Sequence, residues 1–420
     1  MNIKRGILES MIKRIGIVAK DGWNLQISTK QAKSGLFMQA LCLAPDETVQ
    51  TIVNMPLESG DPDFRKTIKS KEFIVIDGLA TLSEGDVSIE PKGSKLRFSN
   101  DVSTMEIDMV ASEVKGANAD KKNSKYSIEI NKDEFLDILK NAIRYTDNNA
   151  YPNIILHVKE RSITVSGLNG NALCYARADC ITLPGNKWDE ACSAYEPLTT
   201  DEAPGCDTAV PAMFVSFLIS ALSLSSANSV SLIVDSKYLH LRYDNYSIIS
   251  VRLSERILKV NNFWSVIESP PEECFAVEKL RFDAAVRLLR KRLDINKALA
   301  ANVGIHLTVH EKALVVSVAD NLVRVPIVEC SGNPTYDMYV APAYLDSAIA
   351  ACKAGNILIK RIPGYEKSFI CANGTVKDGF SSKVPHTLFM ALNMETAQQS
   401  EARFASGIEV TKEEAKAQNK

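Results

Sequence analysis

The sequence predicts an α+β protein made of three similar domains, because one pattern of elements recurs along the whole chain. An amphipathic helix followed by about three short strands appears six times, and the helices begin about 60 to 80 residues apart. Polar segments with the composition of linkers fall at 115–124 and 268–273. Two units per domain place the domains at 1–120, 121–270 and 271–395, followed by a polar C-terminal tail at 396–420.

The two units of the first domain are the least regular. The sequence predicts a helix at about 5–15 with strands from Asn24 onward, and a second helix at about 71–82. The strands expected after the second helix lie near 87–90, 95–98 and 104–109.

The second domain contains the clearest unit, which begins at Asn131. Its helix has an apolar stripe opposite a polar face, formed by Phe135, Leu136, Leu139, Ala142 and Ile143. The strands expected in this domain lie at 153–158, 162–166, 172–178, 230–234, 238–243 and 247–253. An uncharged helix is expected at 213–222, and the segment at about 184–209 is interpreted as an inserted loop.

The third domain repeats the same order. Its first helix starts at Lys279, with an apolar stripe of Phe282, Ala285, Val286, Leu289 and Leu293, and its second helix starts at Ala341. The strands expected here lie near 304–309, 314–318, 322–328, 357–360, 368–371 and 387–394. The residues after 394 are polar, and we expect a mobile tail with some helical tendency.

Composition and charge exclude several classes of protein. The chain has 420 residues and a formal net charge of −2, which argues against a protein that grips nucleic acid through an overall positive surface. Any DNA contact then has to come from local basic faces. No apolar run reaches the roughly 18 residues that span a bilayer, and the first residues lack the apolar block of a signal peptide, so we expect a cytoplasmic protein.

Catalysis and metal binding find little support in the sequence. The nine cysteines are odd in number and include no CxxC pair, which indicates reduced packing residues. Of the five histidines, only His306 and His310 have an HxxxH spacing, and they lack the glutamate of an HExxH helix. No nucleophile elbow or phosphate-binding loop is present. We therefore expect no catalytic residue, no metal and no cofactor, and an unrelated α+β enzyme is the more distant alternative.

One basic cluster stands out on the helix that starts at Lys279. Arg287, Arg290 and Lys291 share one helical face, away from the apolar stripe. The cluster is either a solvated helix face or a surface that meets nucleic acid.

The local sequences resemble the beta subunit of bacterial DNA polymerase III, the beta sliding clamp. The quoted matches are Ile130, Lys132, Phe135, Leu139 and Ala142 with 153–156 and 163–175, then 251–253 with 262–267, then 341–348. Asn171 and Ala172 replace a polar position and an arginine of the family, Ala391 replaces a proline, and the tail continues past the usual end. We expect a divergent clamp, of the kind that a phage or mobile element encodes, whose partner peptides differ from the usual ones.

The resemblance implies a homodimeric ring with sheets outside and helices lining a channel around double-stranded DNA. Lysine and arginine side chains there meet phosphates without reading bases, so the contact is independent of sequence. The DNA-contacting candidates are Lys13, Arg14, Lys69, Lys71, Lys140, Arg144, Tyr145, Tyr151, Arg287, Arg290, Lys291, Lys297 and Lys353. Tyr145 and Tyr151 either pack on sugars or bases or are capping aromatic residues.

The resemblance also implies two protein-binding surfaces. An apolar cleft would hold short peptides of a DNA polymerase and a clamp loader, with Tyr151, Leu168, Gly170, Ala172, Leu173, Asn261, Ser265, Val266, Leu388, Phe389, Met390, Ala391, Leu392 and Met394 as its residues. The candidates for the dimer interface are Met105, Ile107, Leu293 and Ile295, which are either interface or core residues. The alternative is a clamp-fold scaffold that binds peptides without encircling DNA.

Overall fold

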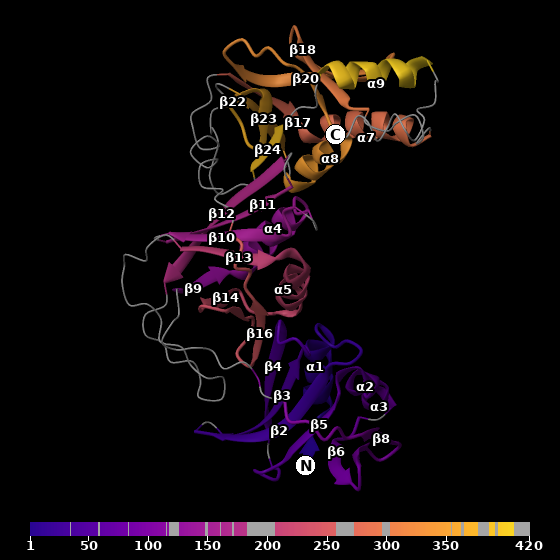
Figure 1. Ribbon diagram of the computed structural model, residues 1–420, viewed down its shortest axis with the longest axis vertical. Coiled ribbons are helices and arrows are strands. Elements are labelled where there is room, and N and C mark those ends of the chain that lie inside the picture. Colours follow the sequence, from indigo (N-terminus) through magenta and orange to yellow (C-terminus); the bar gives the residue numbers. More distant parts are fainter. Residues whose placement is uncertain are drawn as a thin grey trace. The chain divides into compact units, whose positions relative to one another are not determined.

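The structure is a computed structural model, and it describes most of the chain. The described residues are 1–33, 35–57, 59–82, 84–114, 116, 126–147, 150–159, 161–169, 172–182, 206–257, 273–295, 303–353, 355–362, 365–376, 386–390 and 394–406. Helices and strands are mixed throughout, as the α+β prediction requires (Figure 1). None of the described helices is both long and apolar enough to cross a lipid bilayer.

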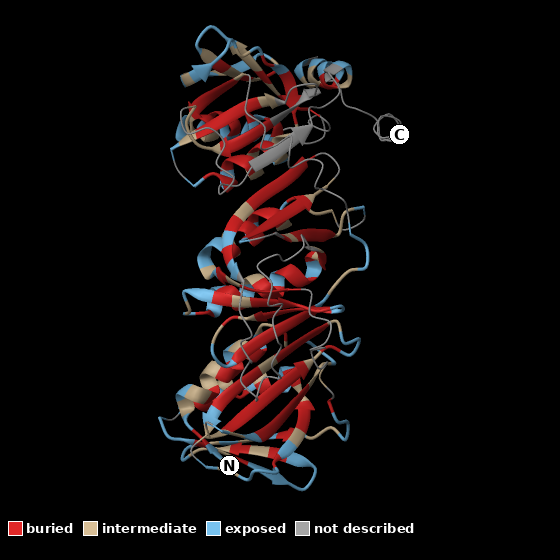
Figure 2. Ribbon diagram, turned by 90° about the vertical axis from the view of Figure 1, so that its left-hand side faces the viewer, coloured by how far each residue is buried: buried red, intermediate tan, exposed pale blue. Residues whose placement is uncertain are grey.

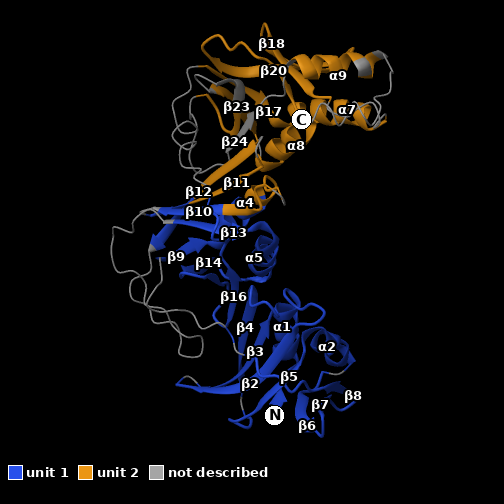
Figure 3. Ribbon diagram, viewed as in Figure 1, with its two compact units in different colours: residues 1–140, 155–163, 178–257 blue, residues 141–154, 164–177, 258–420 orange. Residues whose placement is uncertain are grey.

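The chain divides into two compact units (Figure 3). The first unit comprises Met1–Lys140, Ile155–Ile163 and Ala178–Ile257, and the second comprises Asn141–Ile154, Thr164–Arg177 and Leu258–Lys420. The boundary between them runs through the predicted second domain, and the division into three domains stays a prediction.

A long antiparallel sheet runs through the first unit. Its strand order is β5 (Arg65–Lys69), β2 (Asn24–Ala32), β3 (Gly35–Leu43), β4 (Val49–Leu57), β16 (Ser247–Arg252), β15 (Tyr238–Arg242), β14 (Ser229–Val234) and β9 (Tyr126–Asn131). The pairing of β4 with β16 joins strands on either side of the predicted linker at 115–124, with Ser247 opposite Val53 and Val251 opposite Val49. One sheet therefore passes from the predicted first domain into the second.

Helices and a smaller sheet complete the first unit. Helix α1 (Arg5–Gly16) buries Leu8, Met11, Ile12 and Ile15, and α5 (Ala212–Leu224) is uncharged, as predicted. The smaller sheet has the order β1 (Asn2–Ile3), β6 (Val87–Lys92), β7 (Lys95–Ser99) and β8 (Thr104–Asp108). The helix predicted at 71–82 is two helices, α2 (Ser70–Val75) and α3 (Asp77–Leu82), because the N–H of Ile76 bonds the carbonyl of Phe73 in a tighter turn.

Strands of the predicted second domain lie at the boundary of the two units. They are β10 (Asn153–Lys159), β11 (Ser162–Leu168) and β12 (Ala172–Thr182), and helix α4 (Lys132–Ile143) is divided between the units in the same way. Strand β13 (Cys206–Pro211) lies wholly in the first unit. The end of β12 pairs with β9, whereas its beginning pairs with β24 (His386–Met390).

The second unit has two sheets around one core. One sheet runs β21 (Asp337–Val340), β18 (Ile305–His310), β19 (Ala313–Val318) and β20 (Asn321–Ser331). The other runs β20, β17 (Cys274–Glu278), β22 (Asn356–Ile362), β23 (Tyr365–Asn373), β24 and β12. Helices α7 (Lys279–Ile295) and α8 (Pro342–Ala351) contribute Phe282, Leu289 and Leu345 to the core that these sheets cover. In both units the buried residues follow the strands (Figure 2).

Two findings differ from the sequence pattern. A short strand precedes most of the described helices, as β1 does for α1 and β17 for α7, whereas the predicted units began at the helices. The tail was expected to be mobile with some helical tendency, and Met394–Ser406 form a regular helix, α9, which packs through Phe404 against the core of the second unit. The Glu401 carboxylate accepts hydrogen bonds from the Tyr339 hydroxyl and the Ala319 N–H, both at 2.5 Å, and Ala397 is buried.

Candidate functional site

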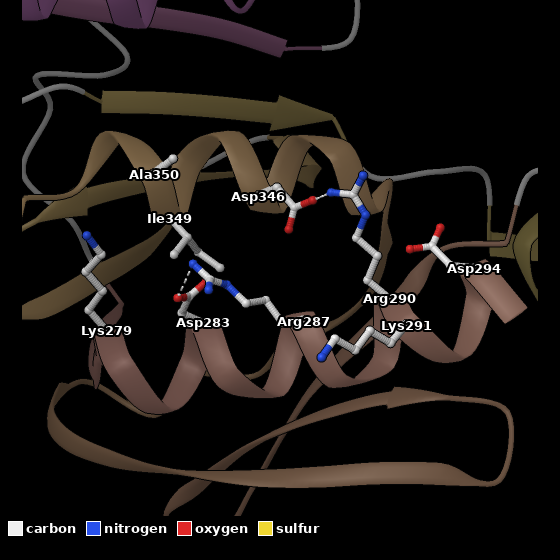
Figure 4. Close-up of a pocket in the computed structure, with 9 residues that line it drawn as sticks. All are labelled: Lys279, Asp283, Arg287, Arg290, Lys291, Asp294, Asp346, Ile349 and Ala350. Atoms are coloured by element: carbon white, nitrogen blue, oxygen red, sulfur yellow. Dashed lines mark hydrogen bonds and ion pairs between the residues drawn. The ribbon is translucent and has the colours of Figure 1, made fainter.

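Helix α7 carries the predicted basic cluster on its exposed face. Its apolar stripe packs into the core, so Arg287, Arg290 and Lys291 project on the other side. A hollow of about 480 Å³ lies between α7 and α8, and Figure 4 shows these side chains around it. The hollow is lined by Lys279, Asp283, Arg287, Arg290, Lys291, Asp294, Asp346, Ile349 and Ala350.

The two arginines of this cluster are held by carboxylates. The Arg287 Nε donates to Oδ1 of Asp283 at 2.9 Å, and its Nη2 lies 2.9 Å from Oδ2 of the same residue. This is a two-pronged pair, the geometry that a planar guanidinium prefers. Arg290 pairs with Asp346, which comes from α8 rather than α7. Two of the three predicted cations are thus already compensated.

The two lysines of the hollow differ in their bonding. Lys279 donates through Nζ to the carbonyls of Cys352 and Lys353, the latter at 3.1 Å, where α8 ends. A cation is favourable there because the last carbonyls of a helix are unpaired and carry partial negative charge. Lys291 is exposed and has no acidic partner among the described residues. It is the cation of the hollow that is free to meet an outside anion.

The other predicted DNA contacts are scattered over both units. Lys13, Lys140, Arg144 and Lys353 are exposed. Arg14 forms an ion pair with Asp244 at 2.8 Å, so α1 is tied to the turn between β15 and β16. Lys69 donates to the Asn24 side chain at 2.9 Å, and Lys71 lies 2.8 Å from the Asp21 carboxylate. Lys297 lies outside the described residues.

The tyrosines of the predicted DNA-contacting loop have different surroundings. Tyr145 is only 1% exposed and belongs to the core of the second unit, so its proposed contact with sugars or bases is wrong. Tyr151 is half-buried, and its carbonyl accepts the N–H of Asp147.

Only part of the predicted peptide-binding cleft can be followed. β12 pairs with β24, with Ala172 opposite Phe389 and Leu173 opposite Leu388. The backbones that carry these candidates are therefore neighbours. Ala172 and Leu173 are themselves buried, and Ala172 is a core residue, so neither side chain faces a peptide. Leu168 is half-buried.

Two more cleft candidates belong to described backbone elements. Met390 lies in β24 and Met394 at the start of α9. Six candidates lie outside the described residues: Gly170, Asn261, Ser265, Val266, Ala391 and Leu392.

The four predicted interface residues separate into core and surface. Ile107 and Leu293 are buried within the chain, so they are core residues and their interface assignment is wrong. Leu293 belongs to the core of the second unit. Met105 is half-buried, and Ile295 is 76% exposed.

Sequence reasoning missed the acidic partners of the basic face. The spacing of Asp283 and Arg287, four residues apart on one helix, is a signal that could have revealed the first pair. Asp346 gives no such signal because it reaches Arg290 from another helix. The described residues contain no group of three side chains that could hold a metal ion.

Comparison with solved structures defines the fold. The DNA polymerase sliding clamp of Pseudomonas aeruginosa superposes with a TM-score of 0.72 at 11% identity, covering 94% of this chain and 99% of that chain. The Helicobacter pylori beta clamp bound to a DNA ligase peptide gives 0.68 at 15% identity, covering 94% and 100%. The DNA polymerase III beta subunit of Thermotoga maritima gives 0.69 at 9% identity, covering 94% and 99%.

The class that these likenesses define is the sliding-clamp fold. More particularly, the chain has the fold of the bacterial beta clamp, the beta subunit of DNA polymerase III. The resemblance found in the sequence is confirmed at the level of the fold, and the low identity agrees with a divergent chain. Neither family sequence models nor the sequences of curated proteins match it.

Proposed function

We propose that the protein is a DNA sliding clamp, a non-catalytic homodimeric ring that encircles duplex DNA in the cytoplasm and tethers a polymerase and other partners through short peptides. The observation that carries this proposal is the beta-clamp fold over 94% of the chain. The exposed basic residues of α7 support it, because cations on such a helix meet phosphates without selecting a sequence. The peptide-bound state of the Helicobacter pylori clamp supports the tethering role.

A second candidate is a clamp-fold scaffold that binds peptides and does not encircle DNA. It is favoured by the surface of α7, where Leu280, Leu288 and Ile295 are exposed beside arginines that already have acidic partners. Exposed apolar side chains of this size commonly mark protein-binding surfaces.

Topological retention on DNA distinguishes the two candidates. After loading onto nicked circular DNA, a ring is expected to stay bound at a salt concentration that removes ordinary DNA-binding proteins, because no phosphate contact has to hold it. Linearising the circle should release it from the ends, with at least about a tenfold loss of bound protein measured by gel filtration. Equal retention on circle and linear DNA would contradict the sliding clamp, as would a sedimentation mass of one chain at the same concentration.

The basic face is tested by changing Arg287, Arg290 and Lys291 together to alanine. All three side chains are exposed, so the fold should persist, and association with short duplex DNA at low salt should weaken. The slope of log affinity against log salt is expected to flatten by between about 0.9 and 2.7, for one to three lost phosphate contacts. An unchanged slope would show that this face does not meet DNA. Far-ultraviolet circular dichroism checks that the variant is folded.

A further inference from the structure

Two acids of the α7 hollow, Asp283 and Asp346, are less exposed than the arginines with which they pair. The Arg287 side chain is 71% exposed and its partner Asp283 is 22% exposed, while the Arg290 side chain is 47% exposed and Asp346 is 25% exposed. Figure 4 shows each pair within the hollow between α7 and α8. In each pair the arginine is therefore the member more accessible to an outside anion.

In this arrangement the arginines can still contact a phosphate, but each contact contributes less favourable binding free energy. A guanidinium has five N–H donors, and the pair with Asp283 occupies Nε and Nη2 of Arg287. Other donors remain for a second anion. That anion, however, meets an ion pair rather than a bare cation, and it is repelled by the carboxylate beneath.

The charges of the hollow are nearly balanced. Four cations line it (Lys279, Arg287, Arg290 and Lys291) together with three carboxylates (Asp283, Asp294 and Asp346). Asp283 and Asp346 are paired with Arg287 and Arg290, so Lys279, Lys291 and Asp294 remain with a net charge of +1. Lys279 donates to the carbonyls at the end of α8. A hollow with nearly balanced charge would attract duplex DNA weakly. Its affinity for DNA would also depend only weakly on the salt concentration, because few phosphates are neutralised.

We propose that Asp283 and Asp346 set the DNA affinity of α7, by compensating Arg287 and Arg290 so that the ring is held on duplex DNA by closure and not by phosphate binding. This inference rests on the proposed sliding-clamp function and concerns the regulation of the same surface. A clamp that bound each phosphate fully would release counterions at every contact and would resist movement along the duplex.

The test compares Asp283→Asn, Asp346→Asn and the double variant with the unchanged chain. Asparagine keeps the size of the side chain and removes its charge, so each arginine becomes available to a phosphate. Binding to a fluorescent linear duplex is measured between 50 and 200 mM salt. For each carboxylate removed, we expect the slope of log affinity against log salt to steepen by up to about 0.9, so the affinity lost over this range grows about three- to fourfold.

A matched control is Asp63→Asn, which changes the net charge equally in an exposed loop of the first unit. It should leave the salt slope unchanged. One-dimensional diffusion on long DNA, measured by single-molecule imaging, should slow in the double variant and stay unchanged in the control.

The outcomes separate this inference from the proposed function. If the triple alanine variant weakens DNA binding but both asparagine variants match the unchanged chain, the carboxylates have no regulatory role and the inference is overturned while the clamp stands. If neither set of variants alters binding, α7 does not face DNA and the inference also fails, while retention on circular DNA still decides whether the protein is a clamp. A steeper slope in the asparagine variants with no change in the control supports the inference.

Discussion

Replacing Gly167 with alanine is expected to destabilise the chain by about 3 kcal/mol or more, the upper end of what overpacking costs. A Cβ at this position would lie 2.0 Å from the carbonyl oxygen of Ala142 and 2.8 Å from its carbonyl carbon. Both are backbone atoms at the end of α4, so no side-chain rotation can relieve the overlap. The helix would have to move away from β11, and buried Tyr145 follows directly behind it. The free energy of unfolding in urea measures the effect.

Gly6→Ala is the matched control for this change. Gly6 lies in α1, and a Cβ there would meet no atom within 4 Å. Alanine also restricts the unfolded chain more than glycine does, so the control should be neutral or stabilising by up to about 1 kcal/mol. If Gly167→Ala unfolded at the same urea concentration as the unchanged chain, the close approach of α4 to β11 would be wrong.

Asp235→Ala is expected to cost about 3 to 5 kcal/mol, the usual range when one partner of a buried charged network is removed. The Oδ1 atom accepts the N–H groups of Lys237 and Tyr238 at 2.6 Å each, and Oδ2 lies 3.3 Å from Nε2 of His240. The other nitrogen of that ring lies 2.7 Å from the Ser250 hydroxyl, which also accepts from Gln50 across the β4–β16 pairing. Removing the carboxylate leaves the N–H groups of Lys237 and Tyr238 and the His240 ring without the anion that they contact.

The cost should depend on pH. Burial alone would raise the pKa of Asp235, but the hydrogen bonds from His240 and from the N–H groups of Tyr238 and Lys237 outweigh it and hold the pKa well below its ordinary 3.8. A group whose pKa is lower in the folded chain contributes stability above its unfolded pKa and loses it as pH falls toward the folded pKa.

The difference in unfolding free energy between the unchanged chain and Asp235→Ala should thus be constant from about pH 5 to 7. It should shrink below about pH 4, by up to about 1.4 kcal/mol per pH unit. Asp63→Ala, at an exposed aspartate, should show neither the cost nor the pH dependence. A difference that stayed the same down to pH 3 would mean that Asp235 is not stabilised as an anion by its neighbours.

The helices were the part of the fold that the sequence predicted best. The stripe of α7 repeats every three to four residues, and a helix has to bury such a stripe, so its core residues follow from local spacing alone. Strand β1 was not predicted because a strand as short as Asn2–Ile3 has no alternation to detect. Its place is decided by pairing with β6, which lies far along the chain.

The sequence predicted only those residues of the candidate site that lie on a single helix. Arg287, Arg290 and Lys291 were found from their spacing, whereas the pairing of Arg290 with Asp346 depends on how α8 packs beside α7. Tyr145 illustrates the same limit, because a tyrosine after a helix suits a surface or a core equally well until the packing is known. Helix α9 was expected only as a tendency, since the contact of Glu401 with Tyr339 joins residues 62 positions apart.

The shared sheet of the first unit has a mechanical consequence. Bending the chain between β4 and β16 would shear a row of backbone hydrogen bonds and would strain the ion pair of Arg14 with Asp244. The backbone pairing of β4 with β16 and this ion pair therefore stiffen the junction. If two such chains form a ring, the ring has to open at another place to admit DNA. The contact between the two chains is one such place, because no covalent bond holds it closed.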